Sequence, residues 1–245
     1  MKQNVEIAPV GMPHEFLEWQ CEERKAMFAA LQRGEMPRFL ASHLPVVSTL
    51  NGRHGAFPIH SSTKGVGLFP AECHLAEQNA EIADCLERCC RKDPSESLGD
   101  RIEVALSLYG RPERMDTGTF GGIEIFRGQT YQNLLEDPRA SLLFTGFGPQ
   151  YMSYQFNCDV ELVEPEDPRF LFLRGMRLLF DMERFHIRQP EYPLGYVYRI
   201  REVFDKTPHV VQTGRRRVSE ETQASAQCPH RIANETMPAL PRNEK

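Results

Sequence analysis

The stretch IEIFRGQTYQNLLEDPRASLLFTGF, residues 123–147, decides the fold that this sequence predicts. Ile123 and Ile125 alternate with Glu124 and Phe126, which is the period of a half-buried strand. The tetrapeptide RGQT then makes a polar break, and its threonine can cap a short helix. The Asp-Pro pair ends that helix, because the residue before a proline is pushed out of the α region. The apolar run ASLLF follows, so the unit is predicted as strand, polar turn, short helix and strand.

Two segments resemble the flavin-binding split-barrel superfamily, which includes pyridoxamine 5'-phosphate oxidases and heme-utilisation proteins. They are NLLEDPRASLLF at residues 133–144 and FNCDVELVE at residues 156–164. The resemblance implies a chain that is mainly β with flanking helices, of the α+β class, built on a six-stranded antiparallel split barrel. One fold hosts many functions, so the two segments do not by themselves identify a reaction.

Length and composition exclude several classes of function. A chain of 245 residues is long enough to bury a full core. The net charge of -5 argues against a general nucleic-acid binder, which usually carries a basic face. No apolar run approaches the roughly 20 residues that cross a bilayer, and the first residues, MKQNVEIAPVG, do not resemble a signal peptide. We therefore expect a cytoplasmic protein with neither a membrane nor a nucleic acid as partner.

The first part of the chain predicts two helices and a hairpin. Residues 13–33 and 70–92 have the apolar periodicity of helices that pack outside a barrel. Residues 39–62 predict two strands around an Asn-Gly turn, the strongest short hairpin signal. Residues 1–94 are then an N-terminal extension. In the alternative, this hairpin supplies the first barrel strands and the whole chain forms one domain.

The second part of the chain predicts the barrel and a tail. The polar linker at 94–101 is the candidate domain boundary. Apolar and polar residues alternate over 102–108, which predicts a strand, and a shorter strand follows at 115–120 before two glycines. We expect the split-barrel domain to span 95–212. Residues 213–245 are expected to form a disordered tail, because apolar residues become scarce there.

Seven cysteines occur without a secretion signal, so free thiols are expected. Cys73, Cys85, Cys89 and Cys90 lie on one predicted helix, and their role is left open. Cys85 and Cys89 share a helical face because they are four residues apart. The chain has no CxxC pair and no second cluster at ligand spacing, so no metal site is predicted.

The polar turn RGQT has the chemistry of a phosphate site. Arg127 supplies a cation, and Gln129 and Thr130 supply side-chain donors. The turn also precedes a short helix, whose dipole favours an anion at this end. The resemblance to flavin-binding barrels implies that the anion is the phosphate of FMN, with Tyr131 as an aromatic neighbour.

The resemblance implies an FMN-dependent oxidoreductase of the pyridoxamine 5'-phosphate oxidase-like type, acting as a homodimer on an unidentified small molecule. It places Met115 and Thr117 beside the isoalloxazine ring. No catalytic side chain is identified, which suits a reaction carried by the flavin. One alternative is a heme-binding or heme-degrading protein on the same barrel, with His186 or His209 as axial ligand. The other is a non-catalytic flavin- or ligand-binding module.

Overall fold

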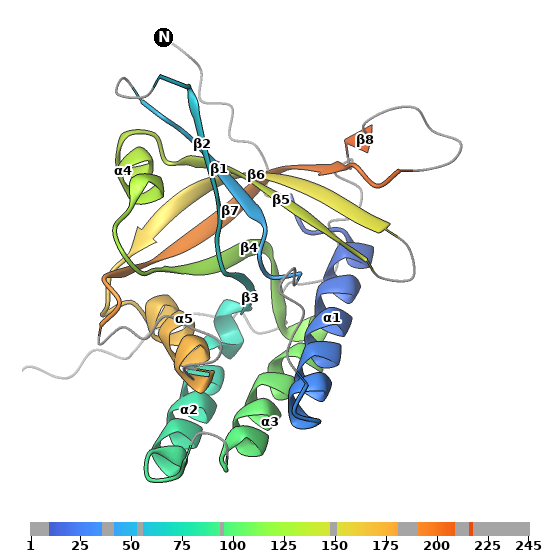
Figure 1. Cartoon of the computed structure of the whole chain (residues 1–245), viewed down its shortest axis with the longest axis vertical. Helices are drawn as coiled ribbons and strands as arrows, with labels where there is room; N and C mark the ends of the chain where they lie inside the picture. Colours follow the sequence, from blue (N-terminus) through green and yellow to red (C-terminus); the bar gives the residue numbers. More distant parts are fainter. Residues whose placement is uncertain are drawn as a thin grey trace, which may run out of the picture.

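The chain forms one antiparallel sheet with helices at its side and end (Figure 1). The strand order is β2-β1-β5-β6-β7-β4-β3, and β8 pairs with β7. This is an α+β fold, as the sequence predicts. The computed structural model describes residues 10–35, 42–52, 56–93, 96–147, 151–180, 191–208 and 216–217.

Long strands form the centre of the sheet and short strands form its edges. Every pairing between neighbouring strands is antiparallel. The strands are β1 (Val46–Leu50), β2 (Ile59–Thr63), β3 (Val66–Pro70), β4 (Met115–Glu124), β5 (Arg139–Phe147), β6 (Tyr151–Val163), β7 (Leu194–Asp205) and β8 (Arg216–Arg217).

The two ends of the strand order are adjacent in the sequence. Within the described ranges, β2 pairs only with β1 and β3 pairs only with β4, so hydrogen bonds do not close the sheet. Lys64 and Gly65 are the only residues between β2 and β3. The six-stranded barrel is therefore observed as an open path of seven strands.

Strands β1 to β3 come from the segment before the predicted linker. Val46 of β1 lies opposite Leu143 of β5, and Val66 of β3 lies opposite Gly122 of β4. The hairpin strands and β3 therefore belong to the same sheet as β4 and β5. The predicted tail at 213–245 lies outside the described residues apart from β8.

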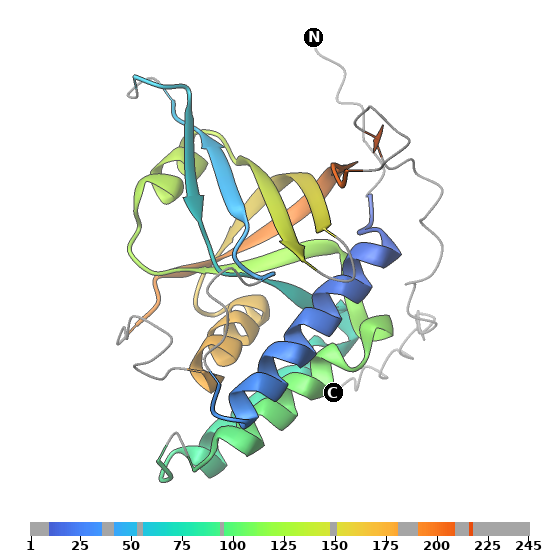
Figure 2. The same ribbon diagram turned by 45° about the vertical axis from the view of Figure 1, so that its right-hand side comes forward.

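Of the five α-helices in the described ranges, four gather on one side of the sheet, and α4 lies beside the β1–β2 hairpin (Figures 1 and 2). Helix α2 packs against α5, and α1 packs against α3. The two helices predicted near the N-terminus are confirmed as α1 and α2. The helices are α1 (His14–Gln32), α2 (Glu72–Cys89), α3 (Leu98–Tyr109), α4 (Gln129–Glu136) and α5 (Pro168–Leu179), with a 3₁₀ turn at Pro112–Arg114.

One predicted strand is wrong, because residues 102–108 belong to helix α3. Ile102, Ala105 and Leu108 are buried and recur every three positions, while Glu103 is exposed. These intervals place the buried residues on one face of a helix. The apolar residues of this segment fit both the alternation of a strand and the period of a helix. Packing against α1 and α2 favours the helix.

The strand predicted at 115–120 is longer than expected and continues through Gly121 and Gly122 as β4. A Cβ atom on Gly121 would lie 2.3 Å from the Phe69 ring and 2.5 Å from the Leu173 side chain. This glycine therefore permits close packing inside a continuous strand and does not mark a turn.

The core contains an aromatic cluster to which helix α1 contributes Phe16. This side chain is fully buried, and its ring centroid lies 4.6 Å from that of Phe156. The ring centroids of Phe144 and Phe120 lie 5.2 and 5.9 Å away. A helical residue thus completes the core between strands β4, β5 and β6.

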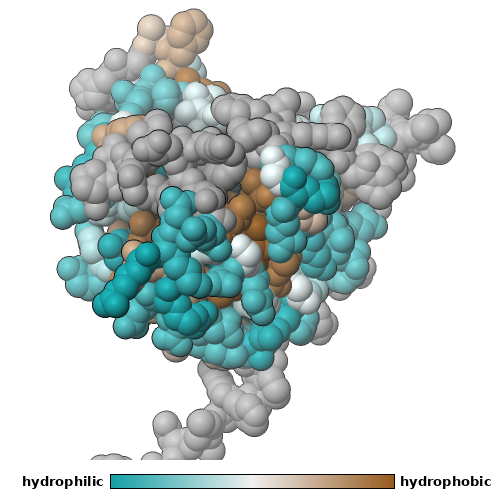
Figure 3. Space-filling view, turned by 60° about the horizontal axis from the view of Figure 1, so that its bottom comes forward, coloured by the Kyte–Doolittle hydropathy of each residue, from teal (hydrophilic) through white to brown (hydrophobic). Residues whose placement is uncertain are grey.

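The helical side of the molecule carries both polar and apolar surface. Figure 3 shows an apolar area bordered by hydrophilic side chains on this side. The helices also contribute partly buried apolar residues that pack on the core, among them Met27, Leu106 and Leu178. Among the described helices, none has the length and apolarity that a membrane crossing requires.

Candidate functional site

The predicted phosphate turn connects β4 to α4. Gly128 precedes the helix, and a Cβ atom placed on it would meet nothing within 4 Å. No side chain caps the N-terminus of α4. Backbone N–H groups of the first helical turn therefore have no capping side chain, and open space adjoins them at Gly128. This arrangement suits an anion.

Arg127 has an unusual backbone conformation. Its φ is 49°, and it is the only residue other than glycine with a positive φ in the described part of the chain. The side chain is exposed, and its guanidinium carbon lies 5.9 Å from the centroid of the Tyr131 ring, within the range of a cation–π contact. The structure thus brings these two predicted site residues together.

The other polar residues of the turn are bound to the rest of the protein. The Gln129 amide donates to Oδ1 of Asn133 at 2.8 Å, and Asn133 donates to Oγ1 of Thr49 at 2.9 Å. Thr130 is only 2% exposed, and its hydroxyl lies 3.2 Å from that of Ser62. These contacts fix α4 on β1 and β2. Arg127 and Gln129 are the exposed side chains of the turn, and of these two only Arg127 carries a charge that can attract an anion.

Met115 and Thr117 lie near the start of β4, whereas the turn follows its end. The strand runs from Met115 to Glu124, a distance of up to about 30 Å at roughly 3.3 Å per residue. Met115 is fully buried, and the carbonyl of Thr117 accepts a hydrogen bond of 2.7 Å from the Met12 N–H. Within one chain, the two parts of the predicted site are not brought together.

A buried carboxylate precedes the turn, and no local sequence signal marks it as a site residue. Glu124 is 1% exposed, and its Oε1 accepts the N–H groups of Ile125 at 3.0 Å and Phe126 at 2.8 Å. Its Oε2 lies 3.2 Å from Nζ of Lys64 and accepts a short hydrogen bond from the Tyr196 hydroxyl. Four donors therefore converge on one carboxylate.

Electrostatics keep this carboxylate ionised. Burial alone raises the pKa of Glu124, but hydrogen bonds from Tyr196 and Phe126 and the charge of Lys64 outweigh burial and lower it. Burial and the hydrogen bond to Glu124 raise the pKa of Tyr196, so the phenol keeps its proton. Lys64 forms an ion pair with Glu124, so its positive charge compensates the charge of this carboxylate.

Cys85 and Cys89 of α2 form a packing contact, whereas Cys73 on the same helix is disulfide-bonded, so the expectation of free thiols is wrong at Cys73. The Sγ atoms of Cys85 and Cys89 are 4.0 Å apart, and both side chains are buried. Burial raises the pKa of Cys85 to about 11, which keeps the thiol protonated at neutral pH. Nowhere in the described ranges do three or more His, Cys, Asp or Glu residues cluster so as to hold a metal ion. The pair packs as small apolar side chains.

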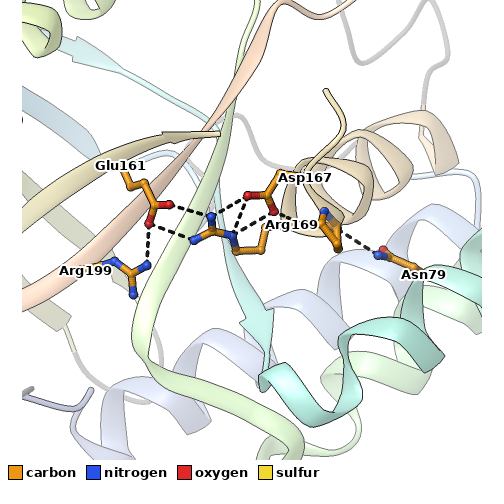
Figure 4. Close-up of polar contacts among 6 residues, drawn as sticks. Asn79, Glu161, Asp167, Arg169 and Arg199 are labelled. Carbon is orange, nitrogen blue, oxygen red and sulfur yellow. Dashed lines mark hydrogen bonds and ion pairs between the residues drawn. The ribbon is translucent and has the colours of Figure 1, made fainter. Parts of the chain in front are cut away.

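A second polar network joins α5 to the outer surface of β6 and β7 (Figure 4). Arg169 contacts Glu161 at 2.7 Å and Asp167 at 2.6 Å, and Glu161 also contacts Arg199 at 2.5 Å. Asn79 of α2 donates to the carbonyl before Arg169 at 2.9 Å. These two cations and two anions neutralise one another, so the network attaches a helix to strands and presents no net charge to a ligand.

The residues at the turn fit a phosphate in part. An exposed guanidinium, an uncapped helix start and open space at Gly128 suit the group, but the Thr130 hydroxyl is already bonded. For heme, His186 and His209 lie outside the described residues. The turn was found from local sequence signals, whereas Glu124 has partners far along the chain.

Comparison with known proteins gives matches among structures only. No family model and no curated protein sequence matches this chain. A putative pyridoxamine 5'-phosphate oxidase from Lactobacillus delbrueckii is 12% identical, with 79% of this chain and 93% of that chain covered and a TM-score of 0.37. An FMN-binding protein from Syntrophomonas wolfei is 11% identical, with 80% and 94% covered and a TM-score of 0.37.

A heme-binding protein from Mycobacterium smegmatis is 12% identical, with 82% of this chain and 58% of that chain covered and a TM-score of 0.39. At such identities and TM-scores, we transfer neither a ligand nor an activity from these proteins to this chain.

Proposed function

We propose that this chain is an FMN-binding protein that holds the flavin phosphate at the β4–α4 turn. Its main support is the exposed guanidinium of Arg127 beside the uncapped start of α4. A phosphate there would receive charge-assisted hydrogen bonds from the guanidinium and N–H bonds from the first helical turn. The helix dipole adds to the attraction, since it leaves partial positive charge at this end.

We extend the proposal to an FMN-dependent oxidoreductase that acts on a small molecule. Bound FMN would supply the electron transfer, which suits a site in which no catalytic side chain is identified. In this proposal, Arg127 binds the phosphate and thereby orients the cofactor. The ring of Tyr131 holds that guanidinium near the helix start.

We also propose that the protein is a cytoplasmic homodimer. Along β1, Val47 is buried, whereas Val46 and Leu50 on the opposite face are 38% and 41% exposed. Ile59 pairs with Leu50 across the hairpin and is 58% exposed. An exposed apolar face of this kind is typical of the surface that a second copy covers.

The proposal is tested by titrating the protein with FMN, with riboflavin, which lacks the phosphate, and with hemin. We expect FMN to bind more tightly than riboflavin, and Arg127→Asn to remove most of this preference. Losing a charge-assisted contact should weaken FMN binding by about 1.5–3 kcal/mol, roughly ten-fold or more. Asparagine tolerates a positive φ, so this change removes the guanidinium without new backbone strain.

Arg139→Asn is the matched control, because Arg139 is an exposed arginine already paired with Asp137. It should leave both flavin affinities unchanged. Equal affinities for FMN and riboflavin would contradict the proposed phosphate site. Tight hemin binding without FMN binding would favour the heme alternative, and binding of neither would favour a module without these cofactors.

A further inference from the structure

We infer that Glu124 is the positioning residue of the phosphate turn, because it holds the backbone that sets Arg127 in its left-handed conformation. This inference rests on the proposed phosphate site and names the group that supports it. Glu124 itself is buried and is not expected to contact the ligand.

The conformation of Arg127 requires such support. In the left-handed region the Cβ atom of an L-residue approaches the following carbonyl oxygen, so residues other than glycine and asparagine seldom adopt it. Arg127 adopts it with a φ of 49°. A strained residue of this kind persists only where its surroundings determine its backbone, and such residues cluster at functional sites.

Glu124 fixes the backbone next to Arg127 through its two carboxylate oxygens. Oε1 accepts the N–H groups of Ile125 and Phe126, the two residues directly before Arg127. Oε2 binds Lys64 at the bend between β2 and β3 and Tyr196 on β7. One carboxylate therefore ties the turn to strand β7 and to the bend that leads into β3, and these attachments set the direction in which the chain leaves β4.

The charges around Glu124 also favour a ligand at Arg127. Lys64 compensates the charge of Glu124, so the carboxylate does not oppose a phosphate nearby. In the part of the chain that the structure describes, the guanidinium of Arg127 has no carboxylate partner, and it lies 5.9 Å from the centroid of the Tyr131 ring. The net charge that remains at the turn is that of Arg127. If the turn had only a structural role, glycine would suit position 127 better than arginine, because glycine adopts a positive φ without strain.

The test compares FMN with riboflavin in Glu124→Gln. Glutamine has the same shape, but its NH₂ group is a donor, so it cannot accept hydrogen bonds on both sides as the carboxylate does. We expect FMN affinity to fall about ten-fold and riboflavin affinity to stay unchanged. In an Arg127→Asn background, the change at Glu124 should have no further effect, because Glu124 acts through Arg127.

Glu161→Gln is the matched control, since Glu161 is also a strand carboxylate that accepts hydrogen bonds from side chains of two other elements, here Arg169 and Arg199. It should leave the preference for FMN unchanged. If Glu124→Gln does not fold, Lys64→Gln is the second variant and should reduce the same preference a few-fold.

The outcomes separate this inference from the proposed function. If Arg127→Asn removes the preference for FMN but Glu124→Gln retains it, Glu124 is not the positioning residue and the phosphate site stands. Equal losses of FMN and riboflavin affinity in Glu124→Gln would show a general structural role and overturn the inference. A wild-type protein without preference for FMN would instead refute the phosphate site itself.

Discussion

Truncating Phe16 to alanine should be among the most damaging single changes in this protein. Phe16 is fully buried although it lies on a helix, and five aromatic rings surround it at centroid distances of 4.6 to 5.9 Å. Four of these rings belong to strands β4, β5 and β6, and the fifth is Trp19.

The expected loss in the free energy of unfolding comes from the apolar contacts that Phe16→Ala removes and from the cavity that it leaves. Replacing a buried phenylalanine by alanine costs about 3–5 kcal/mol. The upper half of this range applies to Phe16, because its neighbours sit on hydrogen-bonded strands that cannot move inward without breaking their register. The free energy of unfolding of a domain is about 5–15 kcal/mol, so the variant would lose a large fraction of it.

The measurement is urea or thermal unfolding of the variant beside Phe57→Ala. Phe57 is 77% exposed, so the same substitution there should change the free energy of unfolding by less than about 0.5 kcal/mol. For Phe16→Ala a loss of 4–5 kcal/mol corresponds to a fall of about 8–20 °C in Tm. A loss below about 1 kcal/mol would show that helix α1 is not part of the core.

Two further predictions concern charge and assembly. Hydrogen bonds from Arg169 lower the pKa of Glu161 below its usual 4.5, so its stabilising charge is present above that value and is lost as the pH falls through the lower folded-state pKa. Glu161→Gln should therefore lose less stability than the wild type between pH 7 and about pH 3, and equal losses in urea unfolding would contradict this. Ile59→Asp should convert the proposed homodimer to monomers in light scattering, because the interface would bury a charge, while Leu171→Asp on α5 should not. A dimer that survives Ile59→Asp would exclude the β1–β2 face.

Local signals in the sequence predicted much of the fold. The Asp-Pro pair ends α4 at Glu136, and the Asn-Gly pair lies in the loop between β1 and β2. The hydrophobic pattern did not predict the right element where the same residues fit both a strand and a helix. In α3 the residues Ile102 and Leu108 fit both an alternating strand and a helical face, and contacts with other helices decide between them.

The candidate site was only partly predictable for a related reason. Arg127 was found because the polar break and the helix start are adjacent in the chain. Glu124 was missed because Lys64 and Tyr196 come from other elements, and no local pattern reports such pairings. Met115 was placed beside a ligand by resemblance alone, whereas the sheet buries it in the core.

The position of β1 in the sheet has a consequence for synthesis of the chain. Val46 lies opposite Leu143, so β1 and the hairpin it begins leave the ribosome long before the strand that covers their edge exists. Until then the edge of β1 that β5 later covers is unpaired and open to chaperones and to other nascent chains. A fragment that ends before helix α3 would keep this edge permanently, so we expect it to aggregate rather than to fold as an independent unit.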